Sequence, residues 1–419
     1  MAVIDLRRLR EEETYRAGVI RKGASSDAID AVLVLEASRR EALAAVENKR
    51  AEANAASKEI GRSAPEDRDA KKAAAKELKD ELGGLEATFN ELDAALSEQT
   101  LPLPNPAHDS VPEGGEEDFR VELTWGETGP APAMDHAEIG VHLGLVDTDR
   151  AVRMSGSRFA YVLGDAVRMQ FGLVQYVMSK LMGHDFIPAV VPVLVREDMM
   201  VDAGFFPADR NQVYEIEKDE LFLVGTAEVG LAGLHRTERL DAEQLPLKYV
   251  GYSTCFRREA GTYGKDTAGL FRVHQFDKVE MFVYCHPDNS WEELEGLRAL
   301  EEEIFTELEI PHRVITVAAG DLGNAAAKKY DIEAWIPSQQ AYREVTSCSN
   351  YTDYSARRMS TRVKDEHGTQ PLHTLNGTAV AIGRTLLSIF ENHQTADGTI
   401  SVPEVLRPFC GGLSEITPR

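Results

Sequence analysis

Apolar residues in the first hundred positions recur at the spacing of long helices. From residue 75 to residue 96 they step alternately by three and four, which defines a heptad seam of Ala75, Leu78, Leu82, Leu85, Phe89, Leu92 and Leu96. A weaker seam precedes it, made of Leu43, Val46, Arg50, Ala53, Ser57 and Ile60. Gly61 can end the first helix, and Ser63 with Glu66 forms a capping box that would start the second. The pattern predicts an antiparallel helical hairpin, preceded by a short amphipathic helix over residues 2–22.

The pattern changes after a run of prolines, Pro102, Pro104, Pro106 and Pro112, which reads as a linker. We therefore predict two domains, residues 1–105 and 106–419. In the second, the apolar spacing predicts helices over 165–181 and 291–308, and strands over 186–195, 220–231 and 312–317. Pro188 and Pro192 favour an edge or interface position for the first of these strands. Residues 373–392 read as a turn, a strand and a helix.

Residues 255–284 read as two strands joined by a Gly-rich polar loop. Alternation would place Arg257 with Glu259 on one face, and Phe276, Lys278 and Glu280 on one face of the returning strand. A solvated hairpin with cross-strand ion pairs is the plain alternative. Glu280, however, lies between Val279 and Met281 in an apolar run, and a buried carboxylate needs a cation or a ligand amine beside it.

Composition narrows the possible partners. With 46 Lys and Arg against 70 Asp and Glu, the net charge of −24 argues against a general binder of nucleic acid or anionic membranes. Charge is uneven along the predicted hairpin. Residues 49–79 carry nine Lys or Arg and six Asp or Glu, whereas residues 80–100 carry six acids and no base. The basic stretch has two equally good interpretations: it binds an elongated polyanion, or its charges only solvate a coiled coil.

Two further features concern location and anion binding. The four cysteines are far apart in the sequence and form no metal-binding motif, and we expect neither a signal peptide nor a membrane helix, hence a cytoplasmic protein. Arg384 falls in the first turn of the last predicted helix, where the helix dipole disfavours a cation. A cation placed there suggests a bound anion beside it.

Several stretches together resemble one enzyme family. The segments FRREAG (256–261) and GLFRVHQFDKVE (269–280) resemble the second motif of class II aminoacyl-tRNA synthetases in its seryl form. TAE (226–228) resembles the serine-loop signature, NGTAVAIGRTL (376–386) the third motif, and residues 186–192 the first motif. The chain thus resembles bacterial-type seryl-tRNA synthetases over essentially its whole length. The resemblance implies an α+β fold, with an antiparallel-sheet catalytic domain and an N-terminal helical-hairpin arm.

The resemblance also implies roles for individual residues. Arg257, Arg384 and Arg272 would be catalytic, and Glu344 with Ser347 would hold Mg²⁺ between the phosphates. Serine would be bound by Thr226, Ala227, Glu228, Glu280 and Thr378. ATP would be bound by Arg257, Arg258, Glu259, Val273, Phe276, Glu344, Val345, Thr346, Ser347 and Arg384. Thr346 and Thr378 each replace a serine that the family pattern leads us to expect.

The implied reaction is ATP-dependent attachment of L-serine to tRNA(Ser) through a seryl-adenylate, and to tRNA(Sec) where a cell has one. The implied assembly is a homodimer without membrane association, with the arm gripping the tRNA. The loop 262–268, with Tyr263 and Lys265, would meet the acceptor end. Two other functions stay open at this point: a catalytically silent paralogue that binds RNA or a partner, and a ligase that loads a carrier protein.

Overall fold

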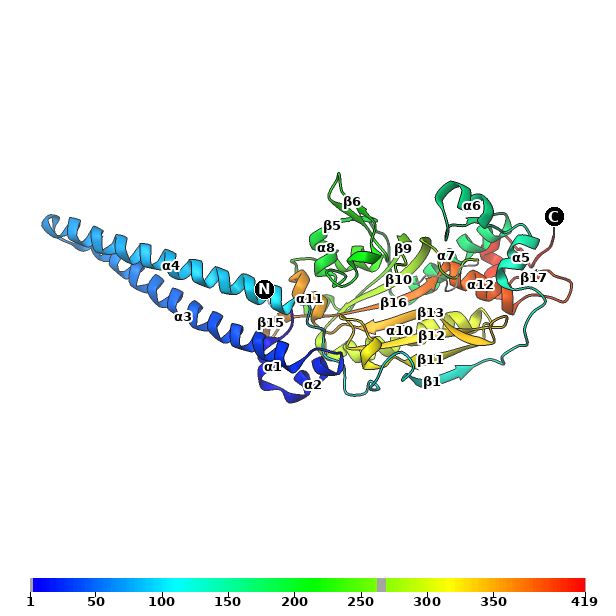
Figure 1. The fold of residues 1–419 in the computed structure, drawn as a ribbon, viewed down its shortest axis with the longest axis horizontal. Coiled ribbons are helices and arrows are strands. Elements are labelled where there is room, and N and C mark those ends of the chain that lie inside the picture. The colour runs from blue at the N-terminus through cyan, green and yellow to red at the C-terminus, as the bar shows by residue number, and fades with distance from the viewer. Residues whose placement is uncertain (1–2, 262–268, 419) are drawn as a thin grey trace. The chain divides into compact units, whose positions relative to one another are not determined.

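The N-terminal part of the chain is almost entirely helical, and the rest is organised around one large sheet (Figure 1). The computed structural model describes residues 3–261 and 269–418. The chain forms two compact units, divided between Pro106 and Ala107.

In the first unit, two long antiparallel helices pack along each other: α3 (Ser26–Arg62) and α4 (Arg68–Thr100). Val46 and Ala53 of the first seam are buried, as are Ala75 and Leu96 of the second, so the predicted hairpin is confirmed. The polar flanks are joined by interhelical ion pairs, Lys49 with Glu81 at 2.9 Å and Arg50 with Glu86 at 2.7 Å.

Two local predictions for this unit are wrong. Residues 2–22 do not form one helix, because Glu12 adopts an extended conformation that separates α1 (Leu6–Glu11) from α2 (Glu13–Arg21). The capping box is absent: the Ser63 hydroxyl donates to the Glu59 carbonyl, and a short 3₁₀ turn, η1 (Pro65–Asp67), leads into α4. Pro65 begins that turn, where its missing N–H costs nothing.

The second unit is built on an eight-stranded sheet. Its strands pair antiparallel, apart from the parallel pairing of the edge strand β4 with β9. In spatial order the strands are β1 (Arg120–Trp125), β11 (His312–Thr316), β12 (Lys328–Ile336), β13 (Ala341–Asn350), β16 (His373–Ala381), β10 (Gln275–Cys285), β9 (Leu247–Phe256) and β4 (Ile187–Val190). This confirms the antiparallel α+β fold and the edge position of the strand that carries Pro188.

Side chains of β10 alternate between two cores. Val279, Met281 and Val283 pack into a large cluster with three helices, α7 (Asp165–Met182), α10 (Ser290–Glu307) and α12 (Ile382–Asn392). Phe282 and Tyr284 face the opposite side, into a smaller cluster. That cluster includes residues of α8 (Glu197–Asp202), α9 (Glu228–Ala232), α11 (Tyr354–Met359) and the small sheet of β5 (Leu194–Arg196), β6 (Glu215–Ile216) and β7 (Leu221–Leu223).

Lys278 and Glu280 lie on the same face as Phe282, as period-two alternation requires. The companion prediction for Arg257 and Glu259 is wrong. The strand β9 ends at Phe256, before both residues, and Glu259 has a φ of 50°, so strand alternation extends to neither. The predicted loop 262–268, with Tyr263 and Lys265, lies outside the described residues.

Smaller elements complete the second unit, and several border the two cavities described next. They are α5 (His136–His142), β2 (Val146–Asp147), α6 (Thr148–Ser155), β3 (Tyr161–Val162), β8 (Arg239–Asp241), β14 (Arg362–Asp365), β15 (Gly368–Pro371), β17 (Ile400–Ser401) and β18 (Glu415–Ile416), with 3₁₀ turns at η2 (Arg210–Gln212), η3 (Ala242–Gln244), η4 (Pro287–Asn289), η5 (Ala319–Asp321) and η6 (Glu404–Cys410).

Candidate active site

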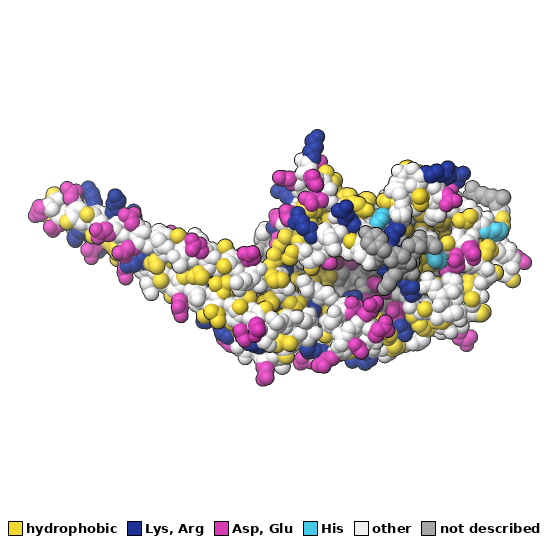
Figure 2. Space-filling model, viewed as in Figure 1, with side chains coloured by type: hydrophobic (Ala, Val, Ile, Leu, Met, Phe, Trp, Pro, Cys, Tyr) yellow, Lys and Arg dark blue, Asp and Glu magenta, His cyan; other side chains and the backbone are white. Residues whose placement is uncertain are grey.

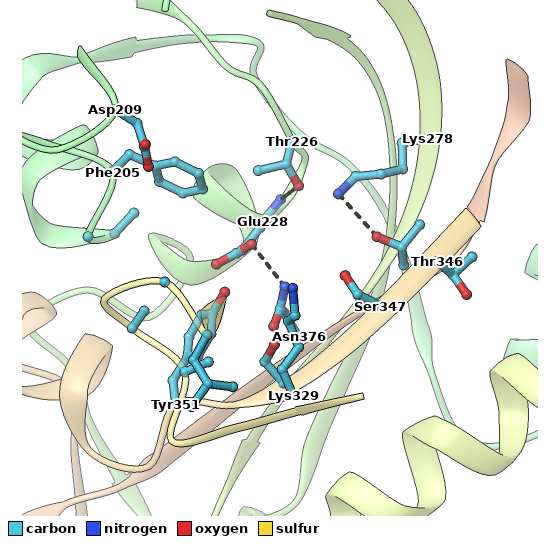
Figure 3. A pocket seen from close by; sticks show the side chains of 18 of the residues that line it. Phe205, Asp209, Thr226, Glu228, Lys278, Lys329, Thr346, Ser347, Tyr351 and Asn376 are labelled. Carbon is cyan, nitrogen blue, oxygen red and sulfur yellow. Dashed lines mark hydrogen bonds between the residues drawn. The ribbon is translucent and has the colours of Figure 1, made fainter. Parts of the chain in front are cut away.

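A cavity of about 250 Å³ opens on the face of the sheet that carries Lys278 (Figure 3). Its walls come from the strands β10, β12, β13 and β16, from the segment before α9 and from the first turn of α12. Nine predicted site residues line it: Thr226, Glu228, Arg257, Glu344, Val345, Thr346, Ser347, Thr378 and Arg384. The fold therefore gathers residues that are up to 158 positions apart in the sequence (226 to 384) into one hollow.

One end of the cavity holds a buried network of polar side chains. The Asn376 amide nitrogen donates to Glu228 at 3.0 Å and to Glu280 at 3.3 Å. The Thr378 hydroxyl donates to Glu280 at 3.2 Å, and the Lys278 ammonium donates to Thr378 at 3.3 Å and forms an ion pair with Glu280. Glu280 is fully buried, and it is joined to the cavity through Thr378 and Asn376, which line it.

Glu228 is the titrating group of this end. Its pKa is raised to about 7: burial is the largest influence and nearby Glu280 adds to it, whereas Lys278, the Tyr351 hydroxyl and Arg257 act in the opposite direction. The main-chain N–H of Glu228 donates to the Thr226 hydroxyl at 3.2 Å, which fixes the start of α9. A carboxyl poised near neutrality in a cavity marks a site built for a charged ligand.

The other end of the cavity is cationic. Arg384, in the first turn of α12, donates to the Glu344 carbonyl at 2.9 Å and pairs with the Glu344 carboxylate at 3.3 Å. Arg257 is held by a hydrogen bond from its Nε to the Gly225 carbonyl at 3.1 Å, and its guanidinium lies 5.2 Å from the centre of the Phe276 ring. Desolvation opposes ionisation of Glu344, but Arg384, Lys329 and Arg257 outweigh it and lower the pKa of Glu344.

A second cavity, of about 320 Å³, adjoins these residues and is more apolar. Val273 and Phe276 line it, together with Leu270, Ile382 and Leu386. Beside it, Arg272 pairs with Glu259 at 2.5 Å. The flat ring of Phe276, with Arg257 at its face, is suited to stacking against a heterocycle.

The remaining predicted residues take other positions. Ala227 is fully buried at the N-terminus of α9 and belongs to the smaller core cluster. The Arg258 guanidinium lies 5.4 Å from the centre of the Tyr214 ring, while its main-chain N–H donates to Gln212. Thr346 also reaches to the far side of the sheet, where its hydroxyl lies 3.4 Å from Glu301.

Several cavity residues were missed from the sequence: Lys278, Asn376, Tyr351, Lys329 and Asp209. Lys278 and Asn376 could have been found, because each stands two positions from a residue that was chosen, on the same face of its strand. Lys329 pairs with Asp331 at 3.4 Å, and burial is the main reason that the pKa of Asp331 rises to about 7. No sequence signal links Lys329 or Asp209 to the site.

Comparison with known proteins agrees with this geometry. Residues 212–393 match the family described as tRNA synthetase class II core domain (G, H, P, S and T), and residues 3–107 match the Seryl-tRNA synthetase N-terminal domain. The fold and the matched core thus define a class II aminoacyl-tRNA synthetase, an enzyme class.

Full-length relatives narrow the family. The chain is 47% identical over 412 residues to a serine--tRNA ligase of Acidothermus cellulolyticus, covering 98% of each chain. It superposes with a TM-score of 0.91 on seryl-tRNA synthetase from Pyrococcus horikoshii complexed with ATP (39% identity, 99% and 100% covered). It superposes with a TM-score of 0.87 on the cytoplasmic serine-tRNA ligase of Naegleria fowleri in complex with AMP (31% identity, 99% of each chain covered). The chain belongs to the seryl-tRNA synthetase family.

Proposed function

We propose that the cavity joins L-serine to ATP and passes the seryl group of the resulting adenylate to tRNA(Ser). The observation that carries the proposal is the division of one cavity into a buried carboxylate end, around Glu228, and a cationic end, around Arg257 and Arg384. Serine carries an ammonium and a hydroxyl to match the first end. Its carboxylate and the phosphates of ATP match the second.

At the carboxylate end, the serine ammonium pairs with Glu228. The Asn376 side-chain oxygen is buried without a hydrogen-bond partner in the described structure, so it is a second acceptor for this ammonium. Thr226 and Ala227 hold Glu228 in place, and Thr378 with Glu280 behind it receives the hydroxyl. Alanine would leave these buried polar groups unpaired, and such a loss can supply large discrimination without an editing domain.

At the cationic end, Arg257 lies between the α-phosphate and the serine carboxylate, two anions that repel each other in its absence. Arg384 binds the γ-phosphate, and its place in the first turn of α12 is explained by that anion. Adenine stacks on Phe276, beside the backbone of Val273. Glu259, held by Arg272, contacts the adenosine. Arg258 is a further proposed ATP contact, and Val345 and Thr346 line the first cavity.

Glu344 and Ser347 are the residues that would hold Mg²⁺. Their oxygens suit a hard cation, both line the cavity, and the lowered pKa of Glu344 keeps its carboxylate ionised at neutral pH. When bound, the ion would neutralise charge on the phosphates. A Glu344→Gln variant should raise the Mg²⁺ concentration required for half-maximal activity; an unchanged requirement would place the ion elsewhere.

The reaction has two steps. A carboxylate oxygen of serine attacks the α-phosphorus, the bond to the bridging oxygen of the β-phosphate breaks, and pyrophosphate leaves. The 3′-terminal ribose hydroxyl of the tRNA then attacks the seryl carbonyl carbon, loses its proton, and AMP leaves. The protein contributes positioning and charge stabilisation through Arg257 and Arg384, without a covalent enzyme intermediate.

The helical hairpin is the proposed grip on the tRNA, with tRNA(Sec) as an additional substrate where it occurs. In Figure 2, Lys and Arg side chains gather toward the tip of the hairpin, mixed with carboxylates. Lys76 and Lys79 are exposed, and neither forms an ion pair in the described structure. Such cations are available to phosphates.

We also propose a homodimer that buries the exposed apolar residues on and near the edge strand β4, among them Val190 (83% exposed), Ile187 (49%) and Phe171 (54%). Light scattering should give twice the chain mass, and a monomer mass would contradict this.

In the described parts of the chain, no helix has the length and apolar character needed to cross a membrane. The cytoplasmic location expected from the sequence stays a prediction.

The experiment that tests the catalytic proposal is serine-dependent exchange of labelled pyrophosphate into ATP. Arg257→Ala should lower kcat/KM by at least about 100-fold, as removal of a single charge-stabilising donor does in other enzymes. Arg362→Ala serves as the matched control, because Arg362 is exposed on β14, away from the cavity. Full activity of Arg257→Ala, with both proteins folded, would refute the assigned role.

A further inference from the structure

Lys278 is the one cation among the hydrogen-bonded groups at the carboxylate end of the described cavity. Its side chain is only 8% exposed and lines the cavity (Figure 3). Its ammonium contacts both Glu280 and Thr378. It lies on β10, two residues from Glu280, so both side chains are held by the same strand of the central sheet. Sequence reasoning gave it no role in catalysis or binding.

The three groups fix the direction of every hydrogen bond between them. An ammonium only donates and an ionised carboxylate only accepts. The Thr378 hydroxyl, 3.3 Å from Lys278 and 3.2 Å from Glu280, must therefore accept from Lys278 and give its own proton to Glu280. Its second lone pair is left as an acceptor. Thr378 and Lys278 both line the cavity, so the cavity meets an oriented acceptor beside an ammonium that has a third N–H.

This arrangement matches a hydroxyl group and rejects its closest substitutes. A ligand hydroxyl can donate to Thr378 while it accepts from Lys278, whereas a methyl group can do neither. A thiol does both poorly, because sulfur is a weak donor and a weak acceptor. Recognition of both hydrogen-bonding capacities of a hydroxyl gives far more discrimination than a pocket of matching shape.

Charge balance points in the same direction. The network contains two buried carboxylates, Glu228 and Glu280, and one ammonium, Lys278. Lys278 is paired with Glu280, which leaves Glu228 as the uncompensated charge for the ammonium of the substrate. Other charged or titratable groups face these three from neighbouring elements: Arg257 and Cys255 on the β9 side, Tyr351 after β13, and Glu301 on α10 behind the sheet.

We propose that Lys278 is a specificity-determining residue that binds the side-chain hydroxyl of serine directly and, through Thr378 and Glu280, orients the acceptor that meets the same hydroxyl. This inference rests on the proposed function, since it names how that site selects its amino acid. Because Lys278 pairs with Glu280, the two carboxylates have different roles. Glu280 orients Thr378 and Lys278 toward the serine hydroxyl, and Glu228 binds the serine ammonium.

The test compares serine with alanine in pyrophosphate exchange, using the full-length enzyme. Lys278→Met removes the ammonium and keeps most of the volume. We expect serine kcat/KM to fall about 100-fold, mainly through KM, while the weak reaction with alanine changes little, so the serine-to-alanine ratio falls by about the same factor. Lys248→Met is the control. Lys248 lies on the neighbouring strand β9 and pairs with Glu293 at 2.8 Å, and loss of its charge should leave the serine-to-alanine ratio unchanged.

A double variant covers the case in which Glu280, left buried without its cation, unfolds the single variant. Lys278→Met with Glu280→Gln removes both charges and should restore the thermal midpoint, yet the serine-to-alanine ratio should stay collapsed. A wild-type ratio in either folded variant would overturn the role of Lys278. Absence of serine-dependent exchange in the wild-type enzyme would instead refute the proposed function itself, so the two failures can be told apart.

Discussion

Buried charge is the feature that determines how individual residues behave in this site. Glu228 and Glu280 are almost inaccessible to water, and burial of a carboxylate is costly unless cations and donors surround it. Asn376, Thr378 and Lys278 supply those partners for Glu280. Glu228 receives fewer, and its pKa consequently rises to about 7, mainly through burial. We propose that a cationic ligand completes the site.

The titration of Glu228 leads to a pH-dependence prediction. In the proposed binding mode the serine ammonium pairs with the ionised carboxylate of Glu228, and with a pKa of about 7 that form is lost as the pH falls below neutrality. The KM for serine in pyrophosphate exchange should therefore be about tenfold higher at pH 6 than at pH 8, following the fraction of ionised carboxylate. The KM for ATP, measured in the same series, provides the control and should change much less.

A serine KM that stays constant from pH 6 to pH 8 would show that Glu228 does not bind the ammonium. Glu228→Gln should abolish the pH-dependence and weaken serine binding at every pH. Retention of the wild-type pH profile in that variant would assign the titration to another group.

Sequence patterns predicted which kinds of side chain form this site better than which of them reach the cavity. Glu280 was expected to be buried because Val279 and Met281 flank it, and it is. Its separation from the cavity by Thr378 and Asn376 depends on the pairing of β10 with β16, which no local pattern contains. The position of Lys278 on the face of Glu280 was predictable from alternation, but its contact with Thr378, a hundred residues away, was not.

At the scale of elements, long periodic segments were predictable and turns were not. The heptad seams predicted α3 and α4, and the amphipathic pattern before Gly183 predicted α7. The capping box at Ser63 failed, because the Ser63 hydroxyl bonds back to Glu59 instead of reaching forward. A serine near a helix end can serve either neighbour, and the sequence does not decide which.

The hairpin of α3 and α4 carries its own prediction. Lys76→Glu with Lys79→Glu should lower serylation of tRNA(Ser) at least about tenfold and flatten its dependence on salt, because fewer phosphates are neutralised. Serine-dependent pyrophosphate exchange, which needs no tRNA, should be unchanged. Glu91→Gln with Glu98→Gln, two exposed acids on the same helix, provides the control.

Equal loss of exchange and of tRNA charging in the lysine variant would indicate a folding defect. Unchanged charging would mean that these two lysines only solvate the coiled coil. Only a selective loss of tRNA charging fits the proposed grip.

At the scale of the whole molecule, the chain forms two compact units, to which we assign different tasks. The helical unit is narrow, with few fully buried side chains along α3 and α4, and it offers length and surface. The sheet-based unit buries apolar clusters on both faces of β10, and so provides the rigid frame that a buried charged site requires. A net charge of −24 confines attraction for a polyanion to local basic patches.

The most direct test of the account is pyrophosphate exchange by the wild-type enzyme, measured separately with each of the twenty amino acids. A cavity with a carboxylate at one end and an oriented hydroxyl-binding pair beside it should support exchange with serine, with alanine lower by a factor of about 10⁴. Exchange that prefers another amino acid, or that is absent with all twenty, would contradict the assignment of this cavity to serine activation.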